Sequence, residues 1–207
     1  HAMAGALDIY SHGNFLAVPP GYGMRESRHE NTLTIQGHDQ VLDPRGEAKL
    51  LRREFGEGFV YLAGEAAGCY PPEAGVGRWV RHVAWIAPDV FVVGDELTAT
   101  RAGQTPTTRT SQAPTTRTGQ APAARTIWRM NYEPMGPNAN DAALDAREQS
   151  FLIAPTDPNR SGALAARFLS PLGLALEKAT VKGPGGGWVA FAQVRAVGIR
   201  ATLPIVH

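Results

Sequence analysis

The sequence has little cysteine, no long apolar run and little helical periodicity. Its single cysteine, Cys69, excludes an internal disulfide and leaves the cellular compartment open. No His or Asp pattern accompanies Cys69, which argues against a nucleophile. No apolar run approaches the length of a membrane span, and the N-terminus lacks the regions of a signal peptide. We therefore expect a soluble protein with no membrane partner.

The net charge is close to zero, but the charges are unevenly distributed. Residues 1–100 carry 8 Lys or Arg and 13 Asp or Glu, whereas residues 101–207 carry 12 and 6. Four arginines of the second half lie in or beside one low-complexity stretch: Arg101, Arg109, Arg117 and Arg125. The sequence therefore shows no basic groove of the kind that nucleic acid requires, and nucleic acid is not expected as a partner.

The sequence does contain many short apolar runs, rich in β-branched and aromatic residues and separated by Gly and Pro. Such runs are typical of strands in a β-sandwich or barrel. The expected strands are residues 7–10, 15–18, 31–35, 48–55, 59–63, 79–86, 90–97, 127–132, 151–153, 165–169, 188–194 and 201–206. Pro88 and Asp89 predict a tight turn between two of them. We expect an all-β fold, a multi-stranded antiparallel β-sandwich of supersandwich-like form, with residues 1–207 as one domain.

Residues 104–127 contain three copies of an eight-residue unit with one Pro and one Arg each. The units have almost no apolar bulk and cannot bury enough surface to offset their ordering entropy, so a disordered insertion is predicted. A spaced array of arginines for an acidic polymer is the functional alternative. Residues 134–141 are interpreted as a loop, and the glycines of residues 183–187 predict a turn before a long strand.

Three segments at the start of the chain share their order and spacing with a known domain. They are His1-Ala2-Met3 with the run that follows, the Pro20-Gly21-Tyr22 turn, and Glu30-Asn31-Thr32 with the strand that ends near Gln40. Residues 78–97 and 128–131 extend the likeness as a long hairpin and the next strand. Together they resemble the C-terminal β-sandwich domain of the heparinase II/III-like family, a group of polysaccharide lyases.

This resemblance implies a two-part enzyme that cleaves uronic-acid-containing glycans by β-elimination. In the family, an α/α toroid upstream of the β-sandwich binds the acidic polysaccharide and supplies most of the catalytic residues. We expect this chain to be the β-sandwich part, inactive alone, with the toroid domain absent from it as a partner. The family also implies a periplasmic or secreted location.

The resemblance assigns roles to five residues of this chain. His1 and Tyr22 correspond to catalytic groups, because His and Tyr suit the proton transfers of β-elimination. Glu30, Asn31 and Arg81 are the expected substrate-binding residues, with Arg81 as a clamp for a uronate or sulfate group.

Each role has a structural alternative. His1 can be only a chain end, and Tyr22 can be a packing residue of its turn. Glu30 can cap a turn or pair with Arg25 or Arg28 as a solvated loop residue. Arg81 alternates with Trp79 and Val83 on one strand face, which favours burial and an ion pair with Asp95 or Glu96. Three further histidines are interpreted as structural or solvent-facing: His12, His38 and His82.

The family's zinc site is expected to be lost, so no cofactor is predicted. The positions of its three ligands hold Met3, Pro19 and Glu30. Proline cannot ligate a metal, and a thioether is a poor zinc ligand. His29 lies one residue from a ligand position but would still lack partners.

Two other functions remain open. The chain can be a non-catalytic carbohydrate-binding or interaction module that kept the fold and lost the active site, which Met3, Pro19 and Glu30 favour. It can also be a fragment of a degraded gene, which the octapeptide expansion would fit.

Overall fold

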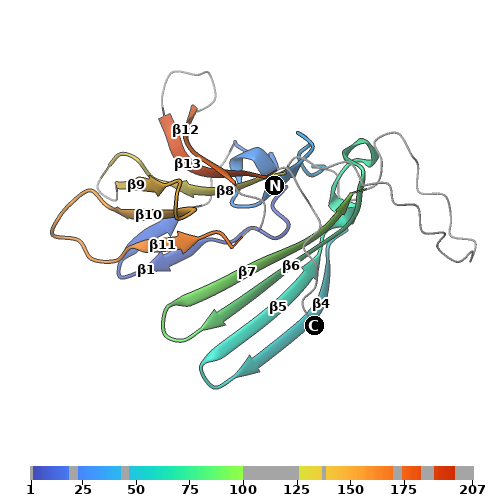
Figure 1. The fold of residues 1–207 in the computed structure, drawn as a ribbon, viewed down its shortest axis with the longest axis horizontal. Coiled ribbons are helices and arrows are strands. Elements are labelled where there is room, and N and C mark those ends of the chain that lie inside the picture. Colours follow the sequence, from blue (N-terminus) through green and yellow to red (C-terminus); the bar gives the residue numbers. More distant parts are fainter. Residues whose placement is uncertain are drawn as a thin grey trace, which may run out of the picture.

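The computed structural model describes residues 2–18, 23–42, 47–99, 126–136, 139–169, 174–182 and 189–198. Within these ranges the chain forms thirteen strands and three single-turn 3-10 helices, and it confirms the all-β class (Figure 1). The elements in chain order are β1 (Ile9–Ser11), β2 (Asn14–Ala17), η1 (Ser27–His29), β3 (Leu33–Ile35), β4 (Lys49–Gly56), β5 (Phe59–Glu65), η2 (Ala67–Cys69), η3 (Pro72–Ala74), β6 (Val76–Ile86), β7 (Val90–Ala99), β8 (Thr126–Tyr132), β9 (Asn140–Asp145), β10 (Ser150–Pro155), β11 (Leu164–Arg167), β12 (Ala175–Lys182) and β13 (Val189–Gly198). None of the helices in these ranges has the length and hydropathy needed to cross a membrane.

The strands form four antiparallel sheets, as the sandwich prediction requires. The sheet orders are β1-β2, β11-β10-β9, β12-β13-β8-β3 and β4-β5-β6-β7. In Figure 1 the long hairpins of the β4–β7 sheet extend away from the other three sheets, which lie together. One end of the β4–β7 sheet is therefore packed against the body of the fold, and its hairpin tips project from it.

The first core cluster fills the space between the β8–β13 pair, the β9–β11 sheet and the β1–β2 hairpin. Its buried residues alternate along β8, β10 and β13, whereas β2 contributes two consecutive residues: Ile9, Leu16, Ala17, Met130, Tyr132, Ala142, Phe151, Ile153, Ala192 and Val194. In β10, for example, Phe151 and Ile153 are buried while Leu152 between them is exposed. This alternation is the period of a strand with one buried face, and it holds the sheets together as a sandwich.

A second cluster anchors the inner end of the β4–β7 sheet. Trp79 is fully buried there, and its ring meets the edge of Tyr70 at a centroid distance of 5.7 Å. Leu33 and Ile35 of β3 belong to the same cluster. Trp128 of β8 packs against both clusters, so it connects the two hydrophobic cores.

Several predicted elements are confirmed, and a few predictions are wrong. The turn at Pro88 and Asp89 does join β6 and β7. The loop predicted for residues 134–141 ends in β9, whose Asn140 is buried and donates to the carbonyl of Phe15 at 3.1 Å. Residues 126–127, assigned to the repeat insertion, begin β8, because Ile127 pairs with both β3 and β13.

The strand β12 was not predicted at all. It is an edge strand that pairs with β13 alone, and its sequence mixes charged with apolar residues instead of forming an apolar run. Three further predictions fall outside the described residues: the insertion over 104–125, the glycine turn at 183–187 and the strand at 201–206.

The alternation in β10 gives a direct test of the sandwich. We expect Ile153→Ala to lower the free energy of unfolding by about 2–5 kcal/mol, because it removes packed methyl groups from a fully buried site. Leu152→Ala, one position away on the exposed face, should cost less than about 1 kcal/mol. Urea unfolding measures both values. Equal losses for the two variants would contradict the placement of β10 in the core.

Candidate functional site

Asn31 is the point at which the first segments of the chain meet. Its side chain is buried, and its Nδ2 donates to Asp8 Oδ1 at 2.7 Å and to the carbonyl of Val18 at 3.1 Å. Its Oδ1 accepts from the backbone N–H of Asn131 at 2.7 Å. The amide therefore connects the N-terminal segment, the end of the β2 region and β8.

The turn that precedes Asn31 is held by the N-terminal segment. The N–H of Ala2 donates to the carbonyl of Arg25 at 2.8 Å, and the hydroxyl of Ser27 donates to the carbonyl of Ala2 at 2.7 Å. The backbone N–H of Gln40 donates in turn to the Ser27 hydroxyl at 3.0 Å. Further along, Thr32 donates to the carbonyl of Ala4 at 2.9 Å. The residues on either side of position 3 thus bind residues close to position 30.

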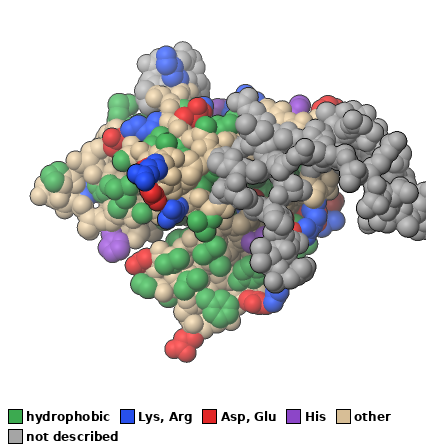
Figure 2. All heavy atoms as spheres, in the orientation of Figure 1, with side chains coloured by type: hydrophobic (Ala, Val, Ile, Leu, Met, Phe, Trp, Pro, Cys, Tyr) green, Lys and Arg blue, Asp and Glu red, His purple; other side chains and the backbone are tan. Residues whose placement is uncertain are grey.

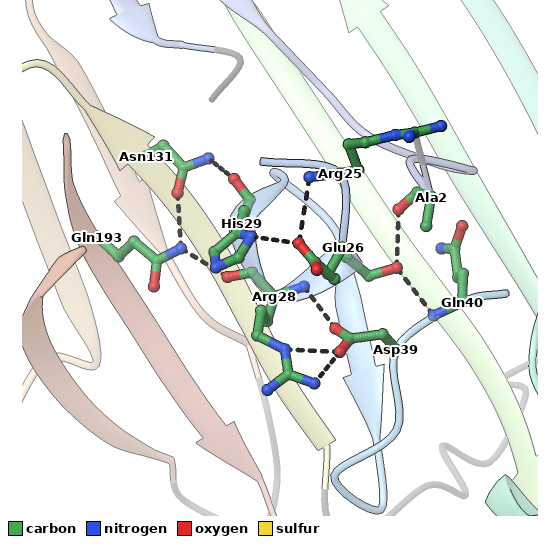
Figure 3. Close-up of polar contacts among 10 residues, drawn as sticks. Ala2, Arg25, Glu26, Arg28, His29, Asp39, Gln40, Asn131 and Gln193 are labelled. Carbon is green, nitrogen blue, oxygen red and sulfur yellow. Dashed lines mark hydrogen bonds and ion pairs between the residues drawn. The ribbon is translucent and has the colours of Figure 1, made fainter. Parts of the chain in front are cut away.

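Two buried amides attach the same turn to the central sheet. Asn131 donates through Nδ2 to the carbonyl of His29 at 2.7 Å, and Gln193 donates through Nε2 to the carbonyl of Arg28 at 2.9 Å. Gln193 also donates to Asn131 Oδ1 at 2.9 Å, and Figure 3 shows the two side chains reaching the turn together. The turn over residues 25–31 is therefore fixed from two sides.

Glu30 lies inside this arrangement, so its interpretation as a solvated loop residue is wrong. Its exposed fraction is 1%. Burial raises the pKa of the Glu30 carboxyl to about 7, and the nearby Asp8 carboxylate adds to the rise. Burial also raises the pKa of Asp8, against the effect of its hydrogen bond from Asn31. Two carboxyl groups that hold protons unusually tightly therefore lie at the meeting point of these segments.

Arg81 is buried and bound within the fold, as its structural alternative predicts. Its Nε and Nη2 donate to the two carboxylate oxygens of Asp95, each at 2.8 Å, and Trp79 Nε1 donates to the same carboxylate at 2.9 Å. The remaining nitrogen, Nη1, donates to the carbonyl of Gly5 at 2.6 Å. All three nitrogens of the Arg81 guanidinium therefore have partners. The partner Gly5 belongs to the N-terminal segment, which also accepts hydrogen bonds from Ser27 and Thr32.

The two predicted catalytic residues, His1 and Tyr22, lie outside the described residues, as does Pro19. Of the positions that match the family's zinc ligands, Met3 is partly exposed and Glu30 is buried. The described residues contain no group of three or more His, Cys, Asp or Glu side chains that could hold a metal. The side chains at positions 3, 19 and 30 do not fit a zinc site, because they offer one thioether, no donor and one carboxyl group.

Sequence reasoning missed a chain of polar groups on the β4–β7 sheet. Tyr61 and His82 share a hydrogen bond of 2.7 Å between Oη and Nδ1, and His82 Nε2 lies 3.1 Å from Glu96 Oε1. Arg78 binds the other carboxylate oxygen and lowers the pKa of Glu96. An imidazole placed between a phenol and a carboxylate is an arrangement suited to proton transfer. Cross-strand pairing of β5, β6 and β7 would have indicated it.

An apolar cleft of about 430 Å³ lies between β7, β8 and β11. Phe91, Trp128 and Phe168 line it, and its charged lining residues are Asp89, Asp95 and Arg167. Hydrophobic side chains also gather on the β4–β7 sheet at the bottom of Figure 2. The surface that the described residues offer to a partner or a sugar is therefore largely apolar in this region.

Comparisons with known proteins leave the family open. No protein-family model matches the chain, and no curated protein is significantly similar to it.

The raised pKa of Glu30 predicts a pH dependence of stability. A carboxyl group with a raised pKa in the folded protein contributes stability that is complete below its unfolded value of 4.5 and is lost as the pH rises through about 7. We expect the free energy of unfolding, relative to that of Glu30→Gln, to fall across this interval by on the order of 1–3 kcal/mol. Asp8→Asn, which removes the facing carboxylate, should shrink the fall. Urea unfolding at several pH values measures it, and a flat difference would contradict the burial of Glu30.

The hydrogen-bonded ion pair of Arg81 predicts that a substitution which keeps the positive charge will still destabilise the protein. Arg81→Lys keeps the charge but cannot donate to both oxygens of Asp95 and to Gly5, so we expect a loss of about 1–3 kcal/mol in urea unfolding. Arg78→Lys, at an exposed pair on the same strand, should cost less than about 1 kcal/mol. If Arg81 were instead a sugar clamp, Arg81→Lys would weaken glycan binding without this difference in stability.

Proposed function

We propose that this chain is the β-sandwich domain of a polysaccharide lyase that cleaves uronic-acid-containing glycans by β-elimination. The supporting observation is the convergence of three segments around Asn31. Residues 2–8 and 27–32 carry two motifs of the family resemblance, and Val18 precedes the third, Pro20-Gly21-Tyr22, in the sequence. Hydrogen bonds bring residues 2–8, Val18 and residues 27–32 together. Adjacent motifs in space are what a shared site at this position requires.

β-elimination needs three functions: neutralisation of the uronate carboxylate, a base for the C5 proton and an acid for the leaving oxygen. In the family resemblance, His1 and Tyr22 correspond to proton-transfer groups. Tyr61 and His82 are a second pair of suitable chemistry, with Glu96 to orient the imidazole. The proposal includes no zinc, because Met3 and Pro19 do not supply suitable ligands.

A helical toroid domain is part of the proposal, together with export to the periplasm or beyond. The described structure supports a partner at the β4–β7 hairpins, where apolar residues are exposed on both faces of the sheet. Phe55 is 70% exposed and Val92 is 54% exposed. Exposed apolar surface of this kind is typical of a docking surface. The tips of these hairpins are where we expect the helical domain to pack.

The alternative function, a non-catalytic carbohydrate-binding module, has its own supporting observation. Glu30, Asn31 and Arg81 are all buried. Asn31 and Arg81 spend their hydrogen bonds on Asp8, Asp95 and the backbone, so neither presents a free edge to a sugar. In this alternative the site is a remnant that stabilises the fold.

The decisive measurement is the ultraviolet absorbance of the unsaturated uronate product. We propose to incubate alginate, heparin, heparan sulfate and hyaluronan with this chain, and in parallel with the full reading frame that encodes it. We expect product from the longer protein with at least one glycan and none from the chain alone. Product from neither, with the longer protein folded and still able to bind a glycan, would contradict the lyase and favour the binding module.

Three tyrosine variants of the active protein locate the proton-transfer group. Tyr61→Phe removes the hydroxyl beside His82. Tyr22→Phe removes the hydroxyl to which the family resemblance assigns proton transfer. Tyr10→Phe is the control, since Tyr10 is well exposed on β1. We expect loss of about 100-fold or more in kcat for whichever of the first two donates the proton, and no change for the control. Equal activity of all three would contradict both assignments.

A further inference from the structure

Two arginines lie directly opposite each other on neighbouring strands. Arg129 of β8 pairs in register with Arg195 of β13. Like charges placed opposite each other across an antiparallel pair destabilise a sheet. Arg129 is only 6% exposed, so water screens its charge poorly, whereas the Arg195 side chain is 29% exposed.

The guanidinium of Arg129 is incompletely hydrogen bonded. Its Nη1 donates to Thr34 Oγ1 at 2.8 Å and to the carbonyl of Ile127 at 3.2 Å. Its Nε is buried and has no hydrogen-bond partner in the described part of the chain. Burial lowers the pKa of Arg129 to about 10, with the charge of Arg195 as a further cause. A buried charge normally has a counter-ion and filled hydrogen bonds, and Arg129 has neither in full.

The neighbouring carboxylates are engaged by other groups. Asp39 accepts the backbone N–H of Arg28 at 2.7 Å and also forms an ion pair with the Arg28 guanidinium. Glu177 lies 3.7 Å from Arg195 but is largely exposed. Among the described residues, Arg129 therefore forms no ion pair of its own, and the only carboxylate whose charge opposes the lowering of its pKa is that of Asp39, which Arg28 already binds.

Arg129 and Arg195 line a pocket of about 380 Å³ on the outer face of the central sheet. Its charged lining residues are Arg28, Arg129, Lys182, Arg195 and Asp39, and its hydroxyl groups are those of Thr34 and Thr180. His29 also lines it. A cavity with four positively charged side chains, one of them incompletely hydrogen bonded, and two hydroxyl groups has the chemistry of an oxyanion site.

We propose that this pocket binds one oxyanion, the carboxylate or sulfate group of an acidic sugar. The assignment to a sugar rests on the proposed function, whereas the oxyanion site itself rests on the pocket alone. A bound oxyanion supplies the missing counter-charge between Arg129 and Arg195. It also extends the acidic-glycan contacts of the chain to β8, β12 and β13, a surface to which the family resemblance assigns no role.

Isothermal titration of the chain tests this proposal at constant ionic strength. The probes are sodium sulfate, an unsulfated oligouronide, a sulfated neutral oligosaccharide and an unsulfated neutral oligosaccharide of the same length. We expect saturable binding of the first three and none of the fourth. Arg195→Gln and Lys182→Gln should each weaken binding by about tenfold, because each removes a charge-assisted contact. Lys178→Gln is the control, since Lys178 is also on β12 but binds Asp141 away from the pocket.

A second measurement follows Arg129 itself, because a variant at this buried position risks unfolding. In the wild-type chain, the Nε–H resonance of Arg129 should shift on titration with sulfate and saturate together with the calorimetric signal. No saturable binding, or equal weakening by Lys178→Gln, would overturn the pocket. If sulfate binds but neither the oligouronide nor the sulfated oligosaccharide binds, the assignment to a glycan would be overturned. Neither result depends on lyase turnover, so failure of the pocket and failure of the proposed enzyme are distinguishable.

Discussion

The arrangement of this fold depends on satisfying a few buried amide side chains. Asn31, Asn131 and Gln193 are almost fully buried, and each hydrogen bonds to segments distant in sequence. A buried amide left without partners costs about 1–3 kcal/mol, so these groups accept few alternative positions. Apolar packing alone would allow the N-terminal segment to slide across the sheet. The amides give it one register, and this arrangement holds the buried carboxyl group of Glu30 close to Asp8.

Two buried arginines show two outcomes of the same constraint. Arg81 lies opposite Asp95 across a hairpin, and all three of its nitrogens are hydrogen bonded. Arg129 lies opposite Arg195, and its Nε lacks a partner in the described residues. The contacts of Arg81 are therefore those of a structural group, which anchors the N-terminal segment at Gly5. The contacts of Arg129 do not fit a structural role, because a fold gains no stability from a half-paired buried charge. The complete hydrogen bonding of Arg81 therefore indicates a structural group, and the incomplete hydrogen bonding of Arg129 supports its proposed role in binding an oxyanion.

Much of the β architecture follows from local sequence, whereas the site does not. The alternation of Trp79, Arg81 and Val83 predicts a buried face of β6, and the turn at Pro88 then places Arg81 near Asp95. By contrast, β12 has no apolar run of its own and is a strand only because β13 offers its edge. One partner of Asn31, the backbone N–H of Asn131, lies one hundred residues away in the sequence and reaches Asn31 only through the tertiary fold. No local pattern contains that contact. The sequence around position 30 therefore indicates a solvated loop, although the fold buries Glu30 next to Asn31.

Exposed apolar residues and a chain of polar groups lie on one face of the β4–β7 sheet. By strand alternation and register, Tyr61, His82 and Glu96 share a face with the exposed apolar residues Phe59 and Val92. In the isolated chain, His82 and Glu96 are each about one-third exposed, so solvent competes for their hydrogen bonds. A partner that covers the apolar tips would also enclose the Tyr61–His82–Glu96 chain. Removing water from it would strengthen its electrostatics, because charges interact more strongly in a medium of low dielectric constant. In the proposed two-domain enzyme, the apolar face on which the helical domain would pack is thus also the face whose electrostatic interactions would be strengthened.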